Sequence, residues 1–455
     1  MKIILNFILL SLFGILIFPE IYAALAFGIT LSIGLQIFLK SNESFMFREW
    51  ALFLYASNYL LSPSITYQLN PDKVTYAMKI PSDMYFNLAF PGFLLFCLGM
   101  FTIPNRLFKP EFNKVNQVSI INERFLIQTT ITGVLLRLFS DIFPGEIGFF
   151  LYLLATVRFV GTLSLFALNA KKYGWLLFLV LLIELYTAFR EGMYHDALMW
   201  VIFFALFYVY HTKPSFRTKI LGLGVLILLV LFVQAIKFAH RDQTWYSGKE
   251  SNIETIAEVG ASKANSESLI GEENLFSTLN RGNQAWIFAS TVDRMERYKD
   301  FQGMTNVNKY IEAALLPRFL APNKLESGNK EIFNNFSGHT INEGTSMGLG
   351  IFADGYIAYG AWGVYVFVFL LGLIFSLTFK LVERWTKISP FYVLLILPML
   401  NYAVRPDCEL QTTINHLAKS IVVFGGIVYF TKNRFSLEST DAKRKLIHLN
   451  LMKKL

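Results

Sequence analysis

The sequence predicts an all-α polytopic membrane protein with about twelve transmembrane helices and one long extracytoplasmic insert. Three observations support this fold class. Hydrophobic residues make up 54% of the 455 residues and charged residues only 16%, whereas soluble domains carry about 25% charged residues. Apolar runs long enough to cross about 30 Å of hydrocarbon recur along the chain. Most lysines and arginines lie in the connections between these runs, a pattern that sets membrane topology.

The apolar runs follow one another closely in the first half of the chain and return after the insert. The first run has only Lys2 as a charged start, and the second follows directly after Pro19 and Glu20. We therefore expect a retained helix at the start rather than a cleaved signal peptide. The predicted spans cover residues 3–18, 21–39, 47–63, 85–103, 125–143, 146–168, 174–190, 193–210, 218–238, 350–379, 389–404 and 413–431.

The distribution of positive charge orients these spans. With an even number of spans, both termini lie on one side, and that side receives most of the basic residues. The short connections on the other side hold only Lys73, Lys79, Arg190 and Arg405. Because positive residues are enriched in cytoplasmic loops, both termini are predicted inside and the insert outside. The predicted parts are a membrane domain at 1–238, an extracytoplasmic loop at 239–346, a second membrane segment at 347–431 and a basic cytoplasmic tail at 432–455.

The insert is the one region with the composition of a soluble protein. Its first part, roughly 251–274, is acidic and polar, and we expect it to be rich in loops. Helical periodicity appears at 284–298 and 307–316, and turn-forming residues fill 317–344. The insert has too little apolar sequence for a core of its own, so we expect it to cap the outer ends of the spans.

Ionisable residues inside spans are candidates for function, because burying a charge in hydrocarbon is unfavourable. Six basic residues are predicted near the outer ends of their spans. Such a group at headgroup depth suits a phosphate or pyrophosphate, and the planar fork of arginine binds phosphate oxygens in pairs. These candidates are Arg137, Arg190, Lys237, Arg241, Arg405 and Lys419.

A structural role is the alternative for several of these charges. Arg137 and Asp141 have the i, i+4 spacing of an ion pair within one helix. Arg190 has Glu191 and Asp196 nearby as partners. Arg158 lies deeper in its span, with Glu184 on the next span as its partner. This pair would tie two helices together.

The insert contributes further candidates. Arg318 follows Pro317 and Lys324 lies shortly after Pro322, so the two prolines stiffen a short basic segment. Three later residues, His339, Glu343 and Asp354, are able to accept a proton. The alternative is an ordinary loop histidine at His339 and helix caps or solvated positions at the two acids.

Several classes of function lack their signature in this sequence. There is no P-loop, no His-Glu-x-x-His motif, no Cys/His cluster and no Gly-x-Ser-x-Gly elbow. The two cysteines, Cys97 and Cys408, lie in separate apolar contexts. The net charge of +9 does not form one basic stripe on a soluble domain, so nucleic acid is not an expected partner. We expect no metal and no cofactor.

Four short motifs and their order resemble the Wzy-type O-antigen and oligosaccharide-repeat-unit polymerases of bacteria. Phe189-Arg190-Glu191-Gly192 ends one span, and Lys237 and Arg241 end the span before the insert. Within the insert is Pro317-Arg318-Phe319-Leu320-Ala321-Pro322-Asn323-Lys324. The next span begins with Gly355-Tyr356-Ile357-Ala358-Tyr359-Gly360-Ala361-Trp362-Gly363. The resemblance covers most of the architecture and these motifs in sequence.

This resemblance implies a membrane-embedded glycosyltransferase of the C class in the bacterial inner membrane. Its donor and acceptor would be oligosaccharides linked to polyprenyl pyrophosphate, membrane lipids would be partners, and a chain-length regulator is a further partner to consider. The expected catalytic residues are Arg190, Arg241, Arg318 and His339. The expected substrate-binding residues are Lys237, Lys324, Arg405, Arg137 and Glu343.

Two alternatives fit the same pattern. An O-antigen ligase, or another lipid-linked glycosyltransferase, uses the same kind of donor and differs in its acceptor. A transporter of lipid-linked oligosaccharide would be a non-enzymatic alternative, although transporters typically show repeated halves or broken helices at the bilayer midplane. We see no internal repeat, and the charges gather toward one face.

Overall fold

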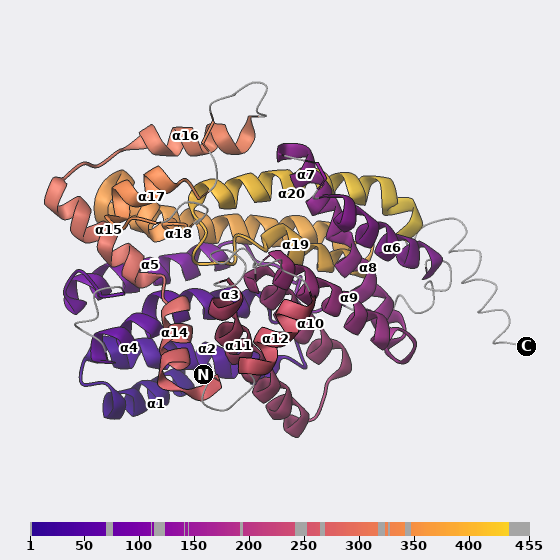
Figure 1. The fold of residues 1–455 in the computed structure, drawn as a ribbon, viewed down its shortest axis with the longest axis horizontal. Helices are drawn as coiled ribbons and strands as arrows, with labels where there is room; N and C mark the ends of the chain where they lie inside the picture. The colour runs from indigo at the N-terminus through magenta and orange to yellow at the C-terminus, as the bar shows by residue number, and fades with distance from the viewer. Residues whose placement is uncertain are drawn as a thin grey trace, which may run out of the picture. The chain divides into compact units, whose positions relative to one another are not determined.

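The computed structural model describes most of the chain, and every regular element in the described residues is a helix (Figure 1). The described residues are 2–69, 76–110, 112, 123–140, 142–143, 145–191, 194–241, 253–263, 269–316, 324–325, 328–341 and 347–435. The predicted all-α class is therefore confirmed for this part of the chain.

The helices group into two compact units, each made of two stretches of sequence. The first unit comprises Met1–Ala77 and Trp175–Ala285, and the second comprises Met78–Gly174 and Trp286–Leu455. The insert is divided between them, since its first part belongs to the first unit and the remainder to the second. The domain boundaries expected from the sequence do not anticipate this division.

The first unit is built around two N-terminal helices packed as a hairpin. Gly14 and Gly28 allow the backbones of α1 and α2 to approach closely, since a Cβ at Gly14 would lie 2.9 Å from the Ala24 carbonyl oxygen. In the insert, α14 packs on α11, and the Asn274 amide donates to the Leu231 carbonyl over 3.2 Å. The helices of this unit are α1 (Lys2–Ile17), α2 (Ile21–Lys40), α3 (Phe47–Ala56), the π-helical turn η1 (Ser57–Leu61), α4 (Ser62–Leu69), most of α9 (Ala170–Glu191), α10 (Tyr194–Thr212), α11 (Phe216–Arg241), α12 (Ile253–Lys263) and α14 (Glu272–Arg281).

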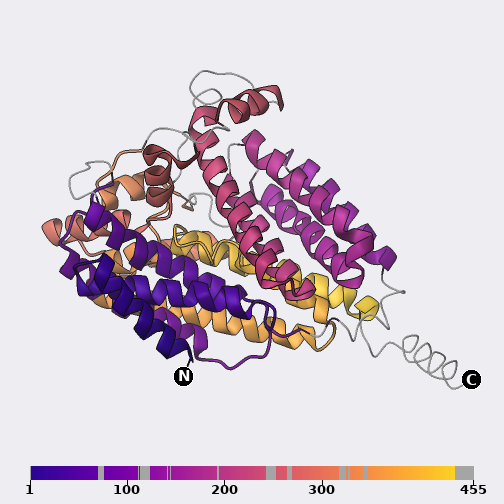
Figure 2. The same cartoon turned by 90° about the horizontal axis from the view of Figure 1, so that it is seen from below.

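The second unit holds α18 (Ile351–Thr386), which packs along α5 (Ser82–Phe101), and α20 (Leu410–Phe435), which lies beside α18 in Figures 1 and 2. Small residues set the α5–α18 contact, because a Cβ at Gly99 or at Gly372 would lie 2.3 Å from a carbonyl oxygen of the other helix. The remaining helices are α6 (Glu123–Ser140), α7 (Gly145–Ala155), α8 (Val157–Leu168), α15 (Ala285–Tyr298), α16 (Met304–Leu315), α17 (Lys330–Ser337), the 3₁₀ helix η5 (Pro390–Leu395) and α19 (Ile396–Leu400).

The described helices fit a multi-pass membrane protein. Seven of them are long and apolar enough to cross a membrane: 21–40, 82–101, 147–168, 170–190, 216–237, 351–386 and 410–432. Two shorter apolar helices, 5–17 and 390–400, coincide with further predicted spans. All twelve predicted segments fall on helices, but the four at 47–63, 146–168, 350–379 and 389–404 are each built from more than one helical piece.

α18 differs from the single span predicted at 350–379. Its backbone breaks at Tyr359 (φ −144°, ψ 26°) and Gly360 (φ 61°, ψ −143°), so a short helix precedes a long one. The left-handed φ at Gly360 is readily adopted only by glycine. The two pieces fold against each other at Gly355 and Gly363, where a Cβ on Gly363 would lie 1.9 Å from the Gly355 carbonyl oxygen. Gly355 and Gly363 therefore serve close packing between the two pieces of α18.

The insert is more helical than its composition predicts. The expected helices at 284–298 and 307–316 are confirmed as α15 and α16. The expectation of loop-rich structure at 251–274 is wrong, because α12 and α14 begin there, and the turn-rich stretch 317–344 contains α17. In α17 the Asn329 side chain caps the Ile332 N–H at 3.0 Å and Gly338 ends the helix with a φ of 71°. Asparagine and glycine are the usual cap and stop residues of a helix, and here they lie within a stretch whose composition indicates turns.

Candidate functional site

A short turn between α19 and α20 holds Arg405 in a fixed position. Backbone hydrogen bonds from Val404 to Leu400 (2.9 Å) and from Arg405 to Tyr402 (3.1 Å) wind the chain into consecutive turns. The Arg405 guanidinium donates twice to Asp407, from Nη2 over 3.2 Å and from Nε over 3.4 Å. Its Cζ also lies 5.2 Å from the centre of the Tyr402 ring. The cation is thus held by a carboxylate on one side and an aromatic ring on the other.

His416 and Lys419 continue this group along the first turns of α20. The His416 ring is buried, 4.6 Å from the Tyr402 ring and 6.0 Å from the Phe149 ring of α7. Lys419 Nζ lies 5.0 Å from the centre of the same Phe149 ring. Residues three apart on a helix share a face, which explains why both side chains meet α7. α7 lies against α20 in Figure 1.

Arg137 approaches the same aromatic rings from α6. It is buried, donates to Ser140 Oγ over 3.2 Å, and places its Cζ 6.0 Å from the Tyr152 ring, which is itself 6.5 Å from Phe149. Gly148 makes this possible, because a Cβ there would lie 2.1 Å from the Phe143 carbonyl oxygen where α7 turns back on α6. Asp141, the predicted ion-pair partner of Arg137, lies outside the described residues.

These side chains form one group, here called the basic–aromatic cluster. It joins side chains from α6, from α7, from the turn that precedes α20 and from the first turns of α20. All of these segments belong to the second unit. Two guanidinium groups and one ammonium group surround four rings, and Arg405 pairs with Asp407 over 3.2 Å. An anion with several oxygens, such as a phosphate ester, is the ligand whose chemistry matches such a group. Its members are Arg137, Phe149, Tyr152, Tyr402, Arg405, His416 and Lys419.

The cluster therefore brings together three of the basic residues predicted near the outer ends of the spans, Arg137, Arg405 and Lys419. The sequence analysis did not predict His416, which lies in an apolar helix far from the four motifs described above. Its position three residues before Lys419 and eleven after Arg405 is the signal that could have indicated it. In the described residues no group of three or more His, Cys, Asp and Glu side chains is arranged to hold a metal ion.

Other predicted residues belong to the first unit or lie outside the described residues. Arg190 is exposed near the end of α9, Lys237 is buried in α11, and Arg241 is the last residue of α11. Arg318 and Glu343 lie outside the described residues. The catalytic role of Arg190, Arg241 and Arg318 remains a prediction.

His339 lies just after α17 and is held against α15. Its Nε2 is 3.0 Å from Ser290 Oγ, and its ring meets the Trp286 ring edge-on at 5.0 Å. Burial, with the nearby positive charge of Lys79, lowers the pKa of His339 below its ordinary value of 6.5. The ring is therefore mostly neutral at pH 7 and can accept a proton. Lys324, another predicted residue, donates from Nζ to the Leu316 carbonyl oxygen over 2.7 Å.

Two buried acids meet at the start of α20. Asp354, on the short first piece of α18, accepts the Leu410 backbone N–H over 2.7 Å and thereby caps α20. Glu409 accepts the Gly328 N–H over 2.7 Å, and burial raises its pKa. Burial, with the charges of these two carboxylates, also raises the pKa of Tyr310 on α16. The cap role considered for Asp354 is confirmed, with a helix 56 residues away as its target.

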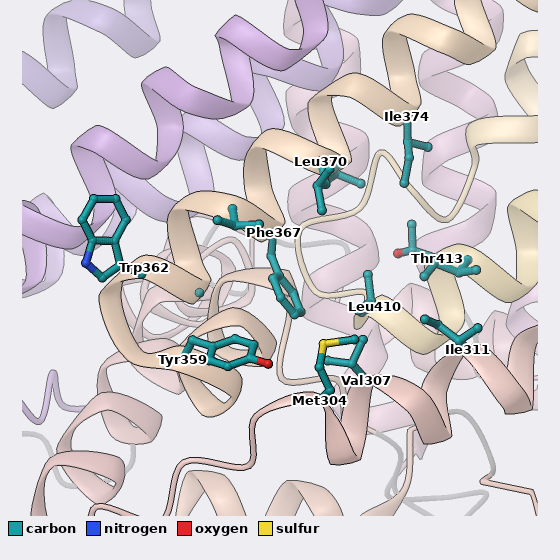
Figure 3. Close-up of a pocket in the computed structure, with 14 residues that line it drawn as sticks. Met304, Val307, Ile311, Tyr359, Trp362, Phe367, Leu370, Ile374, Leu410 and Thr413 are labelled. Carbon is teal, nitrogen blue, oxygen red and sulfur yellow. The ribbon is translucent and has the colours of Figure 1, made fainter.

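An apolar pocket of about 520 Å³ lies on another face of α20, between α16 and the long piece of α18. In Figure 3, Phe367 of α18 points toward Met304 and Val307 of α16, with Leu410 and Thr413 of α20 across the pocket. Its lining comes from three separate segments, so no single stretch of sequence indicated it. The spacing of Met304, Val307 and Ile311 along one face of α16 was its one local signal.

Comparison with known proteins gives one family. Residues 53–387 match the family described as a domain of unknown function, DUF8712. The match begins in α3 and ends one residue after α18, so Arg405, His416 and Lys419 lie beyond it. No curated protein and no solved structure matches the chain. Because the match covers well over half of its 455 residues, the chain belongs to the DUF8712 family.

Proposed function

We propose that this protein is a membrane glycosyltransferase that polymerises lipid-linked oligosaccharide repeat units for a bacterial surface polysaccharide. The polysaccharide would be an O-antigen, a capsule or an exopolysaccharide. The growing glycan is carried on polyprenyl pyrophosphate as the donor, and a second lipid-linked unit is the acceptor. The enzyme would work in the cytoplasmic membrane, with its insert and the site on the outer side and both termini inside.

The observation that carries this proposal is the basic–aromatic cluster on α20. In the reaction, a sugar hydroxyl of the acceptor attacks the anomeric carbon of the donor, and polyprenyl pyrophosphate leaves with the electron pair of the broken C–O bond. Negative charge therefore develops on phosphate oxygens, and preorganised cations are most effective where charge develops. Arg137, Arg405 and Lys419 supply such cations, beside helices that are apolar enough to cross a membrane.

The acceptor hydroxyl must also lose a proton. His339 is the proposed base, and the lowered pKa of its imidazole keeps it in the form that can accept a proton at neutral pH. Its hydrogen bond with Ser290 and its contact with Trp286 hold the ring in one orientation. A pyrophosphate is a good leaving group, so the base contributes less than the cations in this scheme. Arg190, Arg241 and Arg318 remain proposed catalytic residues that stabilise the leaving group, and Lys237, Lys324 and Glu343 remain proposed substrate-binding residues.

The test is polymer length on gels in a strain that lacks the native gene and carries single variants. Arg405→Ala removes a cation, and by analogy with lost oxyanion-hole donors polymer formation should fall about 10²–10³-fold. Arg405→Lys should restore little, because an ammonium lacks the planar fork with which a guanidinium binds two phosphate oxygens in a bidentate pair. Arg297→Ala is the matched control, since Arg297 is exposed on α15 and pairs with Asp293. Arg241→Lys and Arg318→Ala test the remaining predicted arginines, with protein levels in the membrane measured for each variant.

The outcomes separate the proposed activity from its nearest alternative. Loss of polymer while single repeat units are still transferred would support a polymerase over a ligase. Normal polymer from Arg405→Ala, Arg241→Lys and Arg318→Ala together would remove the arginines from the mechanism and with them the support for this function.

A further inference from the structure

The apolar pocket beside α20 has no role in the chemistry described above. Its volume of about 520 Å³ lies within the range of about 300–1,000 Å³ typical of small-molecule sites. The lining consists of apolar side chains from α16, α18 and α20, with Tyr359 and Thr413 as the two that carry a hydroxyl. A pocket of this size and composition is suited to a hydrocarbon ligand.

The break in α18 is what builds the pocket. Because the chain reverses at Tyr359 and Gly360, the long piece of α18 starts beside the beginning of α16. The backbone N–H groups of Gln302 and Gly303 donate to the Ile357 and Ala358 carbonyls over 2.9 and 3.0 Å. These bonds hold the start of α16 against the break. The pocket is thus enclosed by backbone geometry on one side and by helix packing on the other.

Water is a poor occupant of this space. At about 30 Å³ each, roughly 17 waters would be needed to fill it, and each would require two to four polar partners. Apolar cavities of this kind stay dry and accept apolar guests.

The pocket opens toward the lipid-facing side of α18. Trp362, Val366 and Leu370 line it and are also 76%, 50% and 46% exposed, on a helix long and apolar enough to span a membrane. Trp362 lies at the end of the pocket marked by Tyr359 (Figure 3), and both residue types are enriched where hydrocarbon meets the headgroups. A ligand can therefore enter the pocket sideways from the bilayer, past these exposed side chains.

α20 connects this pocket to the basic–aromatic cluster. Leu410, Thr413 and Ile414 line the pocket, whereas His416 and Lys419, within two further turns, belong to the cluster. The two sites therefore lie on different faces of α20, one toward α16 and α18 and the other toward α7. A ligand that has a long apolar chain and a compact, multiply charged anionic head is the one whose two parts match both sites.

We propose that the pocket binds a segment of the isoprenoid chain of a polyprenyl pyrophosphate carrier lipid, whose head faces the basic–aromatic cluster. The identity of the carrier rests on the proposed function, whereas the apolar, laterally open site rests on the geometry alone. The chain would enter past Val366 and Leu370 and lie against Phe367, Val307 and Ile414.

The test uses full-length protein in nanodiscs and a polyprenyl pyrophosphate that carries a photoreactive diazirine on its chain. After irradiation, labelled peptides are identified by mass spectrometry. Val366→Trp adds an indole at the mouth of the pocket and should reduce labelling of the α16 and α20 lining at least tenfold. Leu377→Trp is the matched control, because Leu377 is 52% exposed on the same face of α18, three turns further along, and does not line the pocket. Its labelling should equal that of the native protein.

Folding is checked by size-exclusion profile and thermal unfolding, and Val366→Phe replaces Val366→Trp if the latter fails to fold. Label on the lining that is lost only in the Val366 variant supports the proposal. Label that falls elsewhere, or that persists unchanged in the Val366 variants, overturns it. Equal competition by phosphatidylglycerol and by unlabelled polyprenyl pyrophosphate also overturns it, since the pocket would then bind any lipid chain.

The same samples separate this proposal from the proposed function. If the native protein polymerises lipid-linked repeat units and Val366→Trp does so at the native rate with unchanged label, the pocket assignment fails and the function stands. If labelling behaves as expected but the native protein forms no polymer from donor and acceptor, the function fails and the isoprenoid site stands.

Discussion

At the residue scale, the molecule shows which single side chains the sequence can and cannot assign. Arg137, Arg405 and Lys419 could be selected because a charge in an apolar run is conspicuous. Asp354 was equally visible, yet its partner is the backbone of Leu410, 56 residues later in the chain. No local pattern identifies such a partner, so the sequence allowed a cap and could not say which helix it caps.

His339 provides a prediction of pH dependence. Burial and Lys79 lower its native pKa below 6.5, so an unfolded chain binds a proton at His339 more readily than the folded protein does. The contribution of the neutral ring to stability is therefore full above pH 6.5 and is lost as the pH falls below that value. Thermal unfolding of purified protein between about pH 5 and pH 7.5 should show this loss.

His339→Gln should reduce that acid sensitivity, because glutamine does not titrate and can still bond Ser290. The melting temperatures of variant and native protein should differ less at acidic pH than at neutral pH. Parallel curves across the whole range would show that His339 does not titrate in this way.

At the element scale, helix positions were predictable and helix breaks were not. Apolar runs of about 20 residues identify a span directly, and all twelve predicted segments fall on helices. The sequence does not predict the reversal inside α18, because Gly355, Gly360 and Gly363 fit equally well as ordinary small residues of a packed span. Only their spatial relation, with Gly355 against Gly363 and a left-handed Gly360, separates a turn from a straight helix.

The contact between α5 and α18 provides a second prediction. A Cβ at Gly372 would lie 2.3 Å from the Phe96 carbonyl oxygen and 2.8 Å from the Met100 nitrogen, both of them backbone atoms. Gly372→Ala should therefore push the helices apart and destabilise the protein by about 1–3 kcal/mol, as overpacking typically does. The measurement is the melting temperature and the yield of monodisperse protein in detergent.

Gly222→Ala is the control for that substitution. Gly222 lies in α11, and a Cβ added there would meet nothing within 4 Å, so alanine should be neutral or should favour the helix. If Gly372→Ala is as stable as Gly222→Ala, the close approach of the two helices is not needed for the fold.

At the scale of the whole molecule, the fold class follows from composition but the division into units does not. The two units each combine an early and a later stretch of sequence, and the boundary at Ala285 falls inside the insert. Pairing of distant helices depends on side-chain packing that periodicity does not encode. The same limit applies to the pocket and the basic–aromatic cluster, each of which draws residues from at least three separate segments.

Topology is the property on which the proposed function depends most, because the site must face the side where lipid-linked units are joined. Seven of the described helices meet the length and apolarity needed for a span, whereas the alternation of basic residues requires about twelve. An odd number of spans puts the two termini on opposite sides of the membrane, and an even number puts them on the same side. The location of the termini therefore distinguishes the two counts. Short or broken apolar helices such as 5–17 and 390–400 must cross for the larger count to hold.

The final prediction tests which side of the membrane holds the insert, by cysteine labelling in spheroplasts after Cys97 and Cys408 have been replaced by alanine. Asp300→Cys lies in the exposed turn between α15 and α16, and Ser215→Cys in the exposed connection between α10 and α11. Because Lys213, Arg217 and Lys219 surround Ser215, that connection should be cytoplasmic, so an impermeant thiol reagent should label it only after lysis. Asp300→Cys should be labelled in intact spheroplasts. The opposite pattern would place the insert inside the cell, where it could not join units on the outer surface.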